Sequence, residues 1–318
     1  MVALPLAMAF AIASGVGPER GIYTAIVAGF LISALGGCKV QIGGPTGAFV
    51  VIVAGIMEKF GYDGLMVATI LAGIFLILMG AFRFGSMVKF IPYPVVTGFT
   101  SGIAVIIFSS QMKDFLGLNI GTVPTDFVAK WGVYFQNLGT LNLWALAISL
   151  FTVACIVWWP KAWHKVPGPI AALVLASAIT AWFNLPVETI RTRFGGIPHG
   201  LPSPSFPHVT WELVRLVMPS AVTVAFLAAV ESLLSAVVAD GMINDRHKSN
   251  TELIAQGIAN IVAPVFGGIP ATGAIARTAT NIKNGGRTPV AGIVHALALL
   301  VILLAAHELA AQVPLACL

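Results

Sequence analysis

The sequence predicts an all-α polytopic membrane protein, and its composition, its long uncharged stretches and an internal repeat all favour this fold class. Hydrophobic residues make up 58% of the 318 residues and charged residues 9%, with a mean hydropathy of +0.95. A soluble domain carries roughly a quarter charged residues. Stretches without Asp, Glu, Lys or Arg, each about long enough to cross a hydrocarbon core of roughly 30 Å, include residues 1–18, 21–38, 40–57, 64–82, 90–112, 131–160, 166–187 and 288–307.

Each predicted helix comes from an uncharged stretch or from one that carries few charges. The first seven lie in uncharged stretches, whereas the eighth carries Glu231 and the tenth carries Arg277. Two connections, 113–141 and 185–216, are long. In chain order the predicted helices span residues 2–15, 21–36, 45–57, 65–82, 92–112, 142–159, 168–184, 217–239, 252–266, 272–283 and 289–306, and a twelfth begins near 307.

The remaining connections are short loops with no room for a soluble module, so we expect one transmembrane domain over residues 1–318. The positions of Lys and Arg then predict a cytoplasmic N-terminus, because nine lie on the inner side and seven on the outer side in that orientation. The inner residues are Lys39, Arg83, Lys89, Lys161, Lys165, Arg246, Lys248, Lys283 and Arg287, and the outer ones are Arg20, Lys59, Lys113, Lys130, Arg191, Arg193 and Arg215.

The net charge of +5 does not indicate a nucleic-acid partner, because the basic residues are spread through loops rather than gathered on one face. Cys38, Cys155 and Cys317 have no spacing typical of a metal site. We therefore expect neither a metal nor a cofactor.

An internal repeat links two glycine-rich segments. GGPTGAF at 43–49 and GGIPATGAI at 267–275 share Gly-Gly, a proline and Thr-Gly-Ala, and the two Thr-Gly-Ala triplets lie 226 residues apart. The same offset places the helix at 2–15 over the Glu231 helix and aligns Gly15 with Gly241, where both helices should end. With an odd number of helices between them, the two units run in opposite directions. This pattern is typical of the inverted repeats of transporters, here with a first repeat at about 1–184 and a partial second repeat at about 217–318.

Glycine and proline at matching places in both repeats indicate two helices that begin inside the membrane. Non-helical backbone at that depth is stable only when it is buried in protein or lines a wet cavity. A helix that begins there directs unpaired N–H groups and a partial positive charge into the cavity. Two such half-helices that meet form a cradle for an anion. The alternative is that small residues only allow close helix packing, and the occurrence of both motifs in register favours the site.

Arg277 is predicted to lie more than one turn inside the second half-helix, which should begin at Thr272. A fixed positive charge there attracts and holds an anion. In the alternative, its side chain extends toward Lys283 and the cytoplasmic headgroups.

Glu231 lies in an apolar helix, where an ionised carboxylate is unfavourable. It is either neutral and able to exchange a proton, or paired, with Arg277 as the first candidate partner. Ser232 and Ser235 follow it, and they either solvate the carboxylate or belong to ordinary helix packing. The charged residues of 240–248 are expected to form a solvated loop.

Three segments resemble the sulfate permease (SulP) family of anion transporters, which includes bacterial relatives of prestin and pendrin. They are LPLAMAFAIASGVGPERGIYTAIVAGFLISALGG followed by QIGGPTGAFVV, then ESLLSAVVADGM, and then NTELIAQGIANIVAPVFGGIPATGAIARTATNIKNGGRTPVAG. The resemblance covers essentially the whole chain. It is strongest to bacterial members associated with dicarboxylates, sulfate or bicarbonate, which implies a bacterial inner membrane.

The resemblance implies a fold of seven plus seven inverted helices, divided into a core and a gate, usually as a homodimer with an elevator-like movement. In such proteins the substrate lies between the third and tenth helices. By resemblance, Phe10 and Glu231 supply an aromatic contact and a cation-coupling carboxylate, and the anion is surrounded by Pro45, Thr46, Gly47, Thr272, Gly273, Ala274, Ala276 and Arg277.

The chain departs from that family in two respects. Ala276 and Leu6 replace a serine and a glutamine that animal members often carry, so animal selectivity does not transfer. About eleven or twelve of fourteen helices are present and the STAS domain of the family is absent from this chain, so we expect a truncated product.

The sequence therefore predicts secondary active transport of sulfate, bicarbonate or a C4-dicarboxylate, with a proton, or else sodium, as the coupling ion. The alternatives are an uncoupled anion channel or an anion exchanger. A nucleobase permease is disfavoured because the tenth helix offers arginine and alanines rather than groups that recognise a base. An enzyme is disfavoured because the chain has neither a Gly-x-Ser-x-Gly motif with a membrane histidine nor an HExxH motif.

Overall fold

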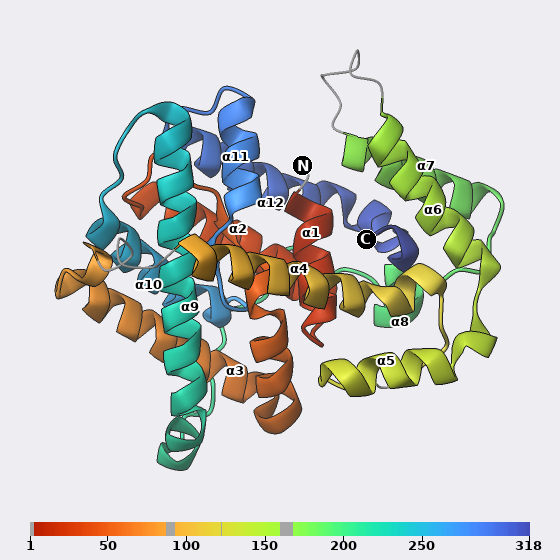
Figure 1. Cartoon of the computed structure of the whole chain (residues 1–318), viewed down its shortest axis with the longest axis horizontal. Helices are drawn as coiled ribbons and strands as arrows, with labels where there is room; N and C mark the ends of the chain where they lie inside the picture. The colour runs from red at the N-terminus through yellow and green to blue at the C-terminus, as the bar shows by residue number, and fades with distance from the viewer. Residues whose placement is uncertain (1–2, 87–92, 122, 160–167) are drawn as a thin grey trace.

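A computed structural model describes residues 3–86, 93–121, 123–159 and 168–318. Within them the chain is helical, with one two-stranded sheet at the centre (Figure 1). The α-helices are α1 (Ala3–Ala13), α2 (Pro18–Leu35), α3 (Val50–Ala81), α4 (Tyr93–Leu116), α5 (Phe127–Gln136), α6 (Leu143–Trp158), α7 (Gly168–Trp182), α8 (Ile190–Phe194), α9 (Trp211–Ile243), α10 (Ser249–Val265), α11 (Ile275–Lys283) and α12 (Pro289–Ala311). The strands are β1 (Gly43–Gly44) and β2 (Thr272–Gly273), and the short 3-10 helices are η1 (Gly47–Phe49), η3 (Leu138–Thr140) and η5 (Leu315–Cys317).

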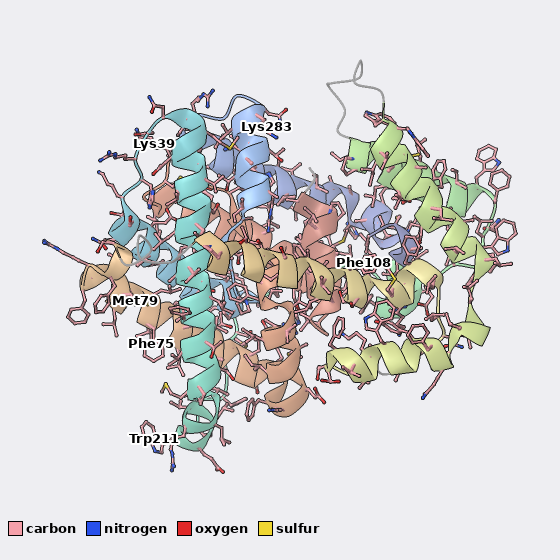
Figure 2. The ribbon with its side chains drawn as sticks, in the orientation of Figure 1. Lys39, Phe75, Met79, Phe108, Trp211 and Lys283 are labelled. Atoms are coloured by element: carbon pink, nitrogen blue, oxygen red, sulfur yellow. The ribbon has the colours of Figure 1, made fainter. Side chains whose placement is uncertain are left out.

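Several of these helices are suited to a membrane. By length and composition, the segments Gly47–Ala81, Trp211–Ile243 and Pro289–Ala311 can each cross one, and α1, α6 and α7 are shorter apolar helices. In Figure 2, Lys39 and Lys283 lie near one end of the molecule and Trp211 lies near the opposite end. Lys39 and Lys283 thus share an end, and the cytoplasmic orientation of that end stays a prediction.

Helix α3 contains the two helices predicted at 45–57 and 65–82. They are separated by a kink at Gly61, whose φ of 63° and ψ of −166° are outside the helical region. Glycine has no Cβ and adopts this conformation without strain. The predicted start at residue 45 is wrong, because the backbone is extended at Thr46 and the α-helix begins only at Val50, after η1.

Helix α9 is longer than the predicted 217–239. Thr210 caps its start by accepting a hydrogen bond from the Leu213 N–H at 3.2 Å, and Asn244 ends it with a φ of 53°. The prediction that this helix ends at Gly241 is therefore wrong, whereas α1 does end just before Gly15.

The two long connections contain short helices that the sequence did not predict. Helix α5 lies within 113–141, where the Asp126 carboxylate accepts a hydrogen bond from the Ala129 N–H at 2.8 Å. Helix α8 lies within 185–216 and is capped by Thr189. Helix α12 also joins two helices across a kink, at Ala306, so the break between the predicted helix at 289–306 and the helix predicted to begin near 307 is present, and the second helix ends at Ala311.

The loop between α9 and α10 is partly packed rather than fully solvated. His247 Nδ1 lies 2.7 Å from Asp240 Oδ2, and its Nε2 lies 2.9 Å from the Ser249 hydroxyl. The His247 side chain is only 8% exposed. Lys39 and Asp245, by contrast, form an exposed ion pair of 2.8 Å.

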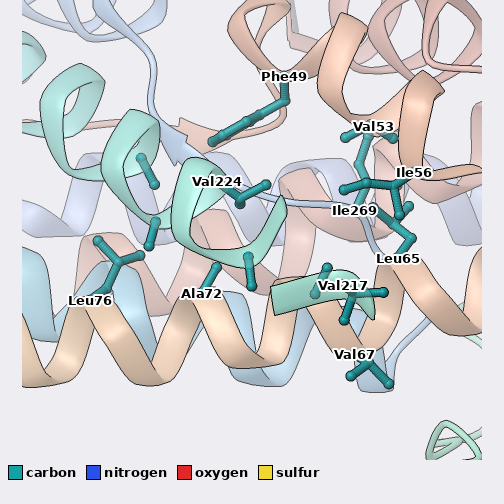
Figure 3. Packing of buried hydrophobic residues seen from close by; sticks show 14 of the residues in the cluster. Phe49, Val53, Ile56, Leu65, Val67, Ala72, Leu76, Val217, Val224 and Ile269 are labelled. Atoms are coloured by element: carbon teal, nitrogen blue, oxygen red, sulfur yellow. The ribbon is translucent and has the colours of Figure 1, made fainter. Parts of the chain in front are cut away.

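The packing centres on α3, which lies against α9 and α10. One hydrophobic cluster joins these helices and includes Val224 of α9 (Figure 3). Its other members include Phe49 of η1 and, on α3, Val53, Ile56 and Leu76. Helices α3 and α10 cross where Gly73 meets Gly257, because a Cβ on either would lie within 2.6 Å of the carbonyl oxygen of the other. Burial of these apolar surfaces stabilises the region around β1 and β2.

A second group of helices, α6 and α7, lies away from α3, α9 and α10 (Figure 1). Helices α6 and α7 pack against each other, and α4 connects them to the rest through contacts with α6, η5 and η1 (Figure 1). Helix α2 packs against α1, α10 and α12. The sheet is thus enclosed by α2, α9 and the two helices that follow its strands.

Candidate functional site

The two glycine-rich motifs meet in the antiparallel pair β1–β2. Gly43 pairs with Gly273 and Gly44 pairs with Thr272. The Ala274 N–H extends the pairing by donating to the Ile42 carbonyl at 2.9 Å. Because the strands are antiparallel, the chain leaves the sheet at opposite ends toward α3 and α11, with the strand pair between the two helix starts. The structure thus brings the two motifs together, and a substrate site between the two helix starts stays a prediction.

Helix α11 begins at Ile275, three residues later than predicted, because Thr272 and Gly273 belong to β2. Arg277 is therefore in the first turn of the helix, and the prediction that it lies more than one turn inside is wrong. The N–H groups of a first turn have no partner within their helix. Arg277 belongs to the same turn as these free donors.

Arg277 extends from α11 to the first motif. Its side chain is buried, with 7% exposure, and Nη2 donates a hydrogen bond to the Pro45 carbonyl. Nη1 is buried and has no hydrogen-bond partner among the residues that the structure describes. A Cβ on Gly44 would lie 2.6 Å from Nη1, so a larger residue at 44 would displace the guanidinium. The alternative in which Arg277 extends toward Lys283 is wrong.

Glu231, on α9, is half-buried, and it accepts a hydrogen bond from Thr46, the residue after Pro45. The Thr46 hydroxyl donates to Glu231 Oε2 at 2.8 Å. Glu231 and Arg277, both among the described residues, form no direct ion pair, so the first candidate partner for Glu231 is wrong. The dipeptide Pro45–Thr46 joins them instead.

Ser232 and Ser235 hold the second motif and do not solvate Glu231. Thr272 Oγ1 lies 2.6 Å from Ser232 Oγ and donates to the Ala228 carbonyl at 3.2 Å. Ser232 Oγ also accepts the Gly273 N–H at 3.1 Å. Ser235 donates to Thr278 Oγ1 at 3.3 Å. Helix α9 therefore fixes β2 and α11 through buried side chains.

Phe10 lies beside the start of α3. Its Cε1 atom is 3.3 Å from the place that a Cβ on Gly47 would occupy. Ala274 is buried and Ala276 is exposed. The structure thus gathers Phe10, the first motif, the second motif and Glu231 around one joint, as the sequence predicts.

Asn260 is a buried residue of this joint that the sequence analysis missed. Its amide donates to the Ala271 carbonyl at 2.8 Å and accepts the Ala271 N–H at 2.9 Å, which fixes the chain just before β2. A signal was present, because Glu252, Gln256 and Asn260 are spaced four apart and form a polar stripe on one face of α10.

Arg20 and Tyr62 hold the segment that precedes β2 from the other side. The Arg20 guanidinium lies 3.4 Å from the centroid of the Tyr62 ring and donates to the Gly267 carbonyl at 3.2 Å. The Tyr62 hydroxyl donates to the Gly268 carbonyl at 2.9 Å. Thr24 accepts the Ile269 N–H at 2.7 Å. Among the described residues, no group of three or more His, Cys, Asp or Glu could hold a metal ion.

The sequence matches the sulfate permease family over residues 1–318. The chain belongs to the sulfate permease family. This is a family of membrane transporters and not of enzymes.

Two curated relatives are similar along the whole chain. YvdB of Bacillus subtilis, named as a candidate sulfate transporter, is 47% identical over 317 residues, which are 99% of this chain and 60% of that protein. The bicarbonate transporter BicA of Picosynechococcus sp. is 37% identical over 341 residues, which cover 100% of this chain and 58% of that protein. The chain thus spans about 60% of the length of the relatives it matches.

Solved structures agree with the fold. The transmembrane domain of a cyanobacterial BicA superposes with a TM-score of 0.90 at 33% identity, over 99% of this chain and 82% of that domain. SLC26A9 superposes with a TM-score of 0.86 at 20% identity, over 99% of this chain and 54% of that chain, and so shows the fold alone. The fold of this membrane family is confirmed, and the count of seven plus seven inverted helices stays a prediction.

Proposed function

We propose that this chain carries a small anion across the membrane and binds it between the starts of α3 and α11. The observation that carries the proposal is the buried Nη1 of Arg277, which has no partner among the described residues although it lies where the two glycine-rich motifs meet. A buried donor without an acceptor is unfavourable, and an anion would supply the acceptor and the opposite charge. Phe10, Pro45, Thr46, Gly47, Thr272, Gly273, Ala274 and Ala276 surround this position in the proposal.

The proposed substrate is sulfate, bicarbonate or a C4-dicarboxylate. Relatives named for sulfate and for bicarbonate support this class. A single guanidinium next to backbone N–H groups at a helix start suits a small oxyanion, because both groups are donors in fixed directions. The apolar Ala276 adds no donor, so an anion bound here would rely on Arg277 and the backbone.

Proton coupling through Glu231 is the second part of the proposal. The Thr46 hydroxyl is bonded to Glu231, and the adjacent Pro45 carbonyl is bonded to Arg277. Binding of an anion at Arg277 would alter the position of Pro45–Thr46 and thereby the environment of the carboxylate. We further propose an elevator-like movement, a homodimer, a cytoplasmic N-terminus and a bacterial inner membrane, which the similarity to bacterial relatives supports.

The test is uptake of radiolabelled sulfate, bicarbonate and fumarate into proteoliposomes, with and without an inward proton gradient. The wild type should accumulate one of these anions when the gradient is present. Arg277→Ala should abolish uptake, because it removes the charge, and Glu231→Gln should leave uptake that no longer responds to the gradient. Arg215→Ala is the matched control, because Arg215 is exposed on α9.

Three outcomes decide between the alternatives. Uptake that ignores both the gradient and Glu231→Gln contradicts proton coupling and leaves an exchanger, a sodium-coupled carrier or a channel. An anion flux, measured as electrical current, that far exceeds the turnover rates of carriers favours the channel. Equal uptake by Arg277→Ala and wild type contradicts the proposed site itself.

A further inference from the structure

A second polar cavity lies away from the half-helix joint. It has a volume of about 530 Å³ and lies between the end of α1, the start of α3, the end of α4, α5 and α8. We call it the α5 cavity, and its charged and phenolic lining residues are Glu58, Lys113, Asp114, Lys130, Tyr134 and Arg193. It does not include Arg277, Thr46 or Glu231, although Val50, the first residue of α3, also lines it. The α5 cavity is therefore separate from the joint and adjacent to it.

The carboxylates of the α5 cavity already have partners. Asp114 Oδ1 lies 2.7 Å from Arg193 Nη2, and Arg193 also pairs with Glu188. Glu58 Oε2 accepts a hydrogen bond from the Thr125 hydroxyl at 3.0 Å. Arg193 is thus neutralised by the acidic groups around it, and the other cations of the cavity are Lys113 and Lys130.

Two ammonium groups of the α5 cavity form no ion pair with a carboxylate that the structure describes, although Asp114 and Glu188 lie close enough to Lys113 to act on its charge. Lys113 Nζ donates to the Ile120 carbonyl, which carries no charge. Lys130, on α5, has neither an ion pair nor a hydrogen bond from its ammonium to any residue that the structure describes. Burial lowers the pKa of Lys130, since the charged form is poorly solvated there. An anion in the cavity would supply Lys130 with a partner of opposite charge.

Tyr134 supplies a neutral donor on the same wall. Tyr134 is 2% exposed, and its hydroxyl has no hydrogen-bond partner in the described part of the chain. Burial, together with the nearby Asp114 carboxylate, raises the pKa of Tyr134 to about 12, so the hydroxyl keeps its proton at neutral pH. The ring is held by an edge contact with Trp131, whose Nε1 donates to Ser109 Oγ at 3.1 Å. A fixed buried donor without an acceptor calls for an acceptor atom from outside the protein.

We propose that the α5 cavity is a second anion-binding site, in which Lys130, Lys113 and the Tyr134 hydroxyl hold a small oxyanion such as sulfate or a carboxylate. The cavity is large enough for such an ion with several waters, because a water occupies roughly 30 Å³ in the liquid. Three cations, Lys113, Lys130 and Arg193, and two carboxylates, Glu58 and Asp114, line the recess, and this excess of positive charge raises the local concentration of anions. The site goes beyond the proposed transport function, since it binds an anion whether or not the chain moves one.

The experiment is competitive acetylation of lysines in the purified chain in lipid nanodiscs, followed by peptide mass spectrometry. Acetic anhydride is uncharged, so its approach does not depend on the potential of the cavity. Sodium sulfate replaces sodium chloride at constant ionic strength. Sulfate should slow acetylation of Lys130 by roughly threefold, the protection expected when about two thirds of the sites are occupied. Lys59, exposed on α3 next to Glu58, is the control and should react at the same rate in both salts.

Tyr134→Phe tests the donor. It keeps the ring and its contact with Trp131, so protection of Lys130 by sulfate should weaken while the rate at Lys59 stays the same. The proposal is overturned if Lys130 reacts equally fast in both salts, if sulfate slows Lys130 and Lys59 alike, or if Lys130 does not react while Lys59 does. Because the readout is acetylation and not uptake, these results are independent of whether the transport proposal holds.

Discussion

Thr46 donates a hydrogen bond of 2.8 Å to the Glu231 carboxylate. The carbonyl of the preceding residue, Pro45, accepts a bond from Arg277, so the carboxylate and the guanidinium are connected through one dipeptide of the first motif. A direct ion pair would neutralise both groups permanently and leave neither for a ligand. The indirect connection leaves Nη1 of Arg277 without a hydrogen-bond partner in the part of the chain that the structure describes.

The first prediction concerns the Thr46 hydroxyl. Thr46→Val keeps the branched side chain and removes the donor, and a hydrogen bond to a charged group contributes roughly 1.5–3 kcal/mol. We expect the initial rate of anion uptake to fall by about tenfold or more, the equivalent of roughly 1.4 kcal/mol or more. Thr46→Ser should restore most of the rate, because serine keeps the hydroxyl.

The matched control for Thr46→Val is Thr223→Val, an exposed residue of α9 whose hydroxyl bonds only to the Pro219 carbonyl. It should transport as the wild type does. If Thr46→Val also transports normally, the bond between Thr46 and Glu231 has no part in the transport cycle.

The second prediction concerns the crossing of α3 and α10. A Cβ on Gly257 would lie 2.5 Å from the Gly73 carbonyl oxygen, and backbone cannot move aside as a flexible side chain can. Gly257→Ala should destabilise the fold by about 1–3 kcal/mol, the usual effect of overpacking. Thermal unfolding in detergent, followed by circular dichroism, measures this as a lower Tm.

Gly102→Ala is the control for that prediction. Gly102 is an exposed residue inside α4 with no atom within 4 Å of its added Cβ. Alanine is the better helix former by about 1 kcal/mol, so the Tm should stay the same or rise. Equal Tm values for the two variants would contradict the close packing of α3 on α10.

The sequence predicted the joint because its signals are local. Two glycine–proline breaks and the charged residues Glu231 and Arg277 are visible without any knowledge of the fold. The repeat also aligned Thr46 with Thr272, but in the structure Thr272 pairs with Gly44 because the strands are antiparallel. The start of α11 was misplaced for the same reason, since Thr272 and Gly273 are held by β1 and α9. Such pairing depends on residues far away in the chain.

Contacts between distant segments could not be predicted. Arg20 and Tyr62 look like ordinary interfacial residues in the sequence, and only the kink at Gly61 brings the Tyr62 ring under the Arg20 guanidinium. Helix α5 was missed because ten residues with Lys130 among them are too short and too polar for a membrane span.

The third prediction concerns the exposed pair Lys39–Asp245. The hydrogen bond from Lys39 lowers the pKa of Asp245 below its ordinary value. The stabilisation is therefore present above the pKa that the carboxyl has in the unfolded chain, and it is lost as the pH falls through the lower pKa of the folded chain. Asp245→Asn should lower the Tm slightly at neutral pH, since exposed ion pairs stabilise little.

The difference in Tm between wild type and Asp245→Asn should disappear in acid, once the pH is below the lowered pKa of Asp245. It should also shrink in high salt, because the charges are screened. A difference that persists or grows in acid would show that Asp245 stabilises the loop by some means other than its charge.

The fourth prediction concerns the clamp that Arg20 and Tyr62 form on the segment before β2. Tyr62→Phe removes one hydrogen bond to the Gly268 carbonyl and should destabilise the fold by about 1 kcal/mol. Arg20→Gln removes the contact with the Tyr62 ring and weakens the bond to Gly267, so the effect should reach about 2 kcal/mol. Hydrogen–deuterium exchange should locate the loss, with faster exchange in peptides that cover residues 266–274. Arg215→Gln, at an exposed arginine of α9, should leave exchange there unchanged. If Arg20→Gln exchanges in this segment as slowly as the wild type, Asn260 and Thr24 alone hold it in place.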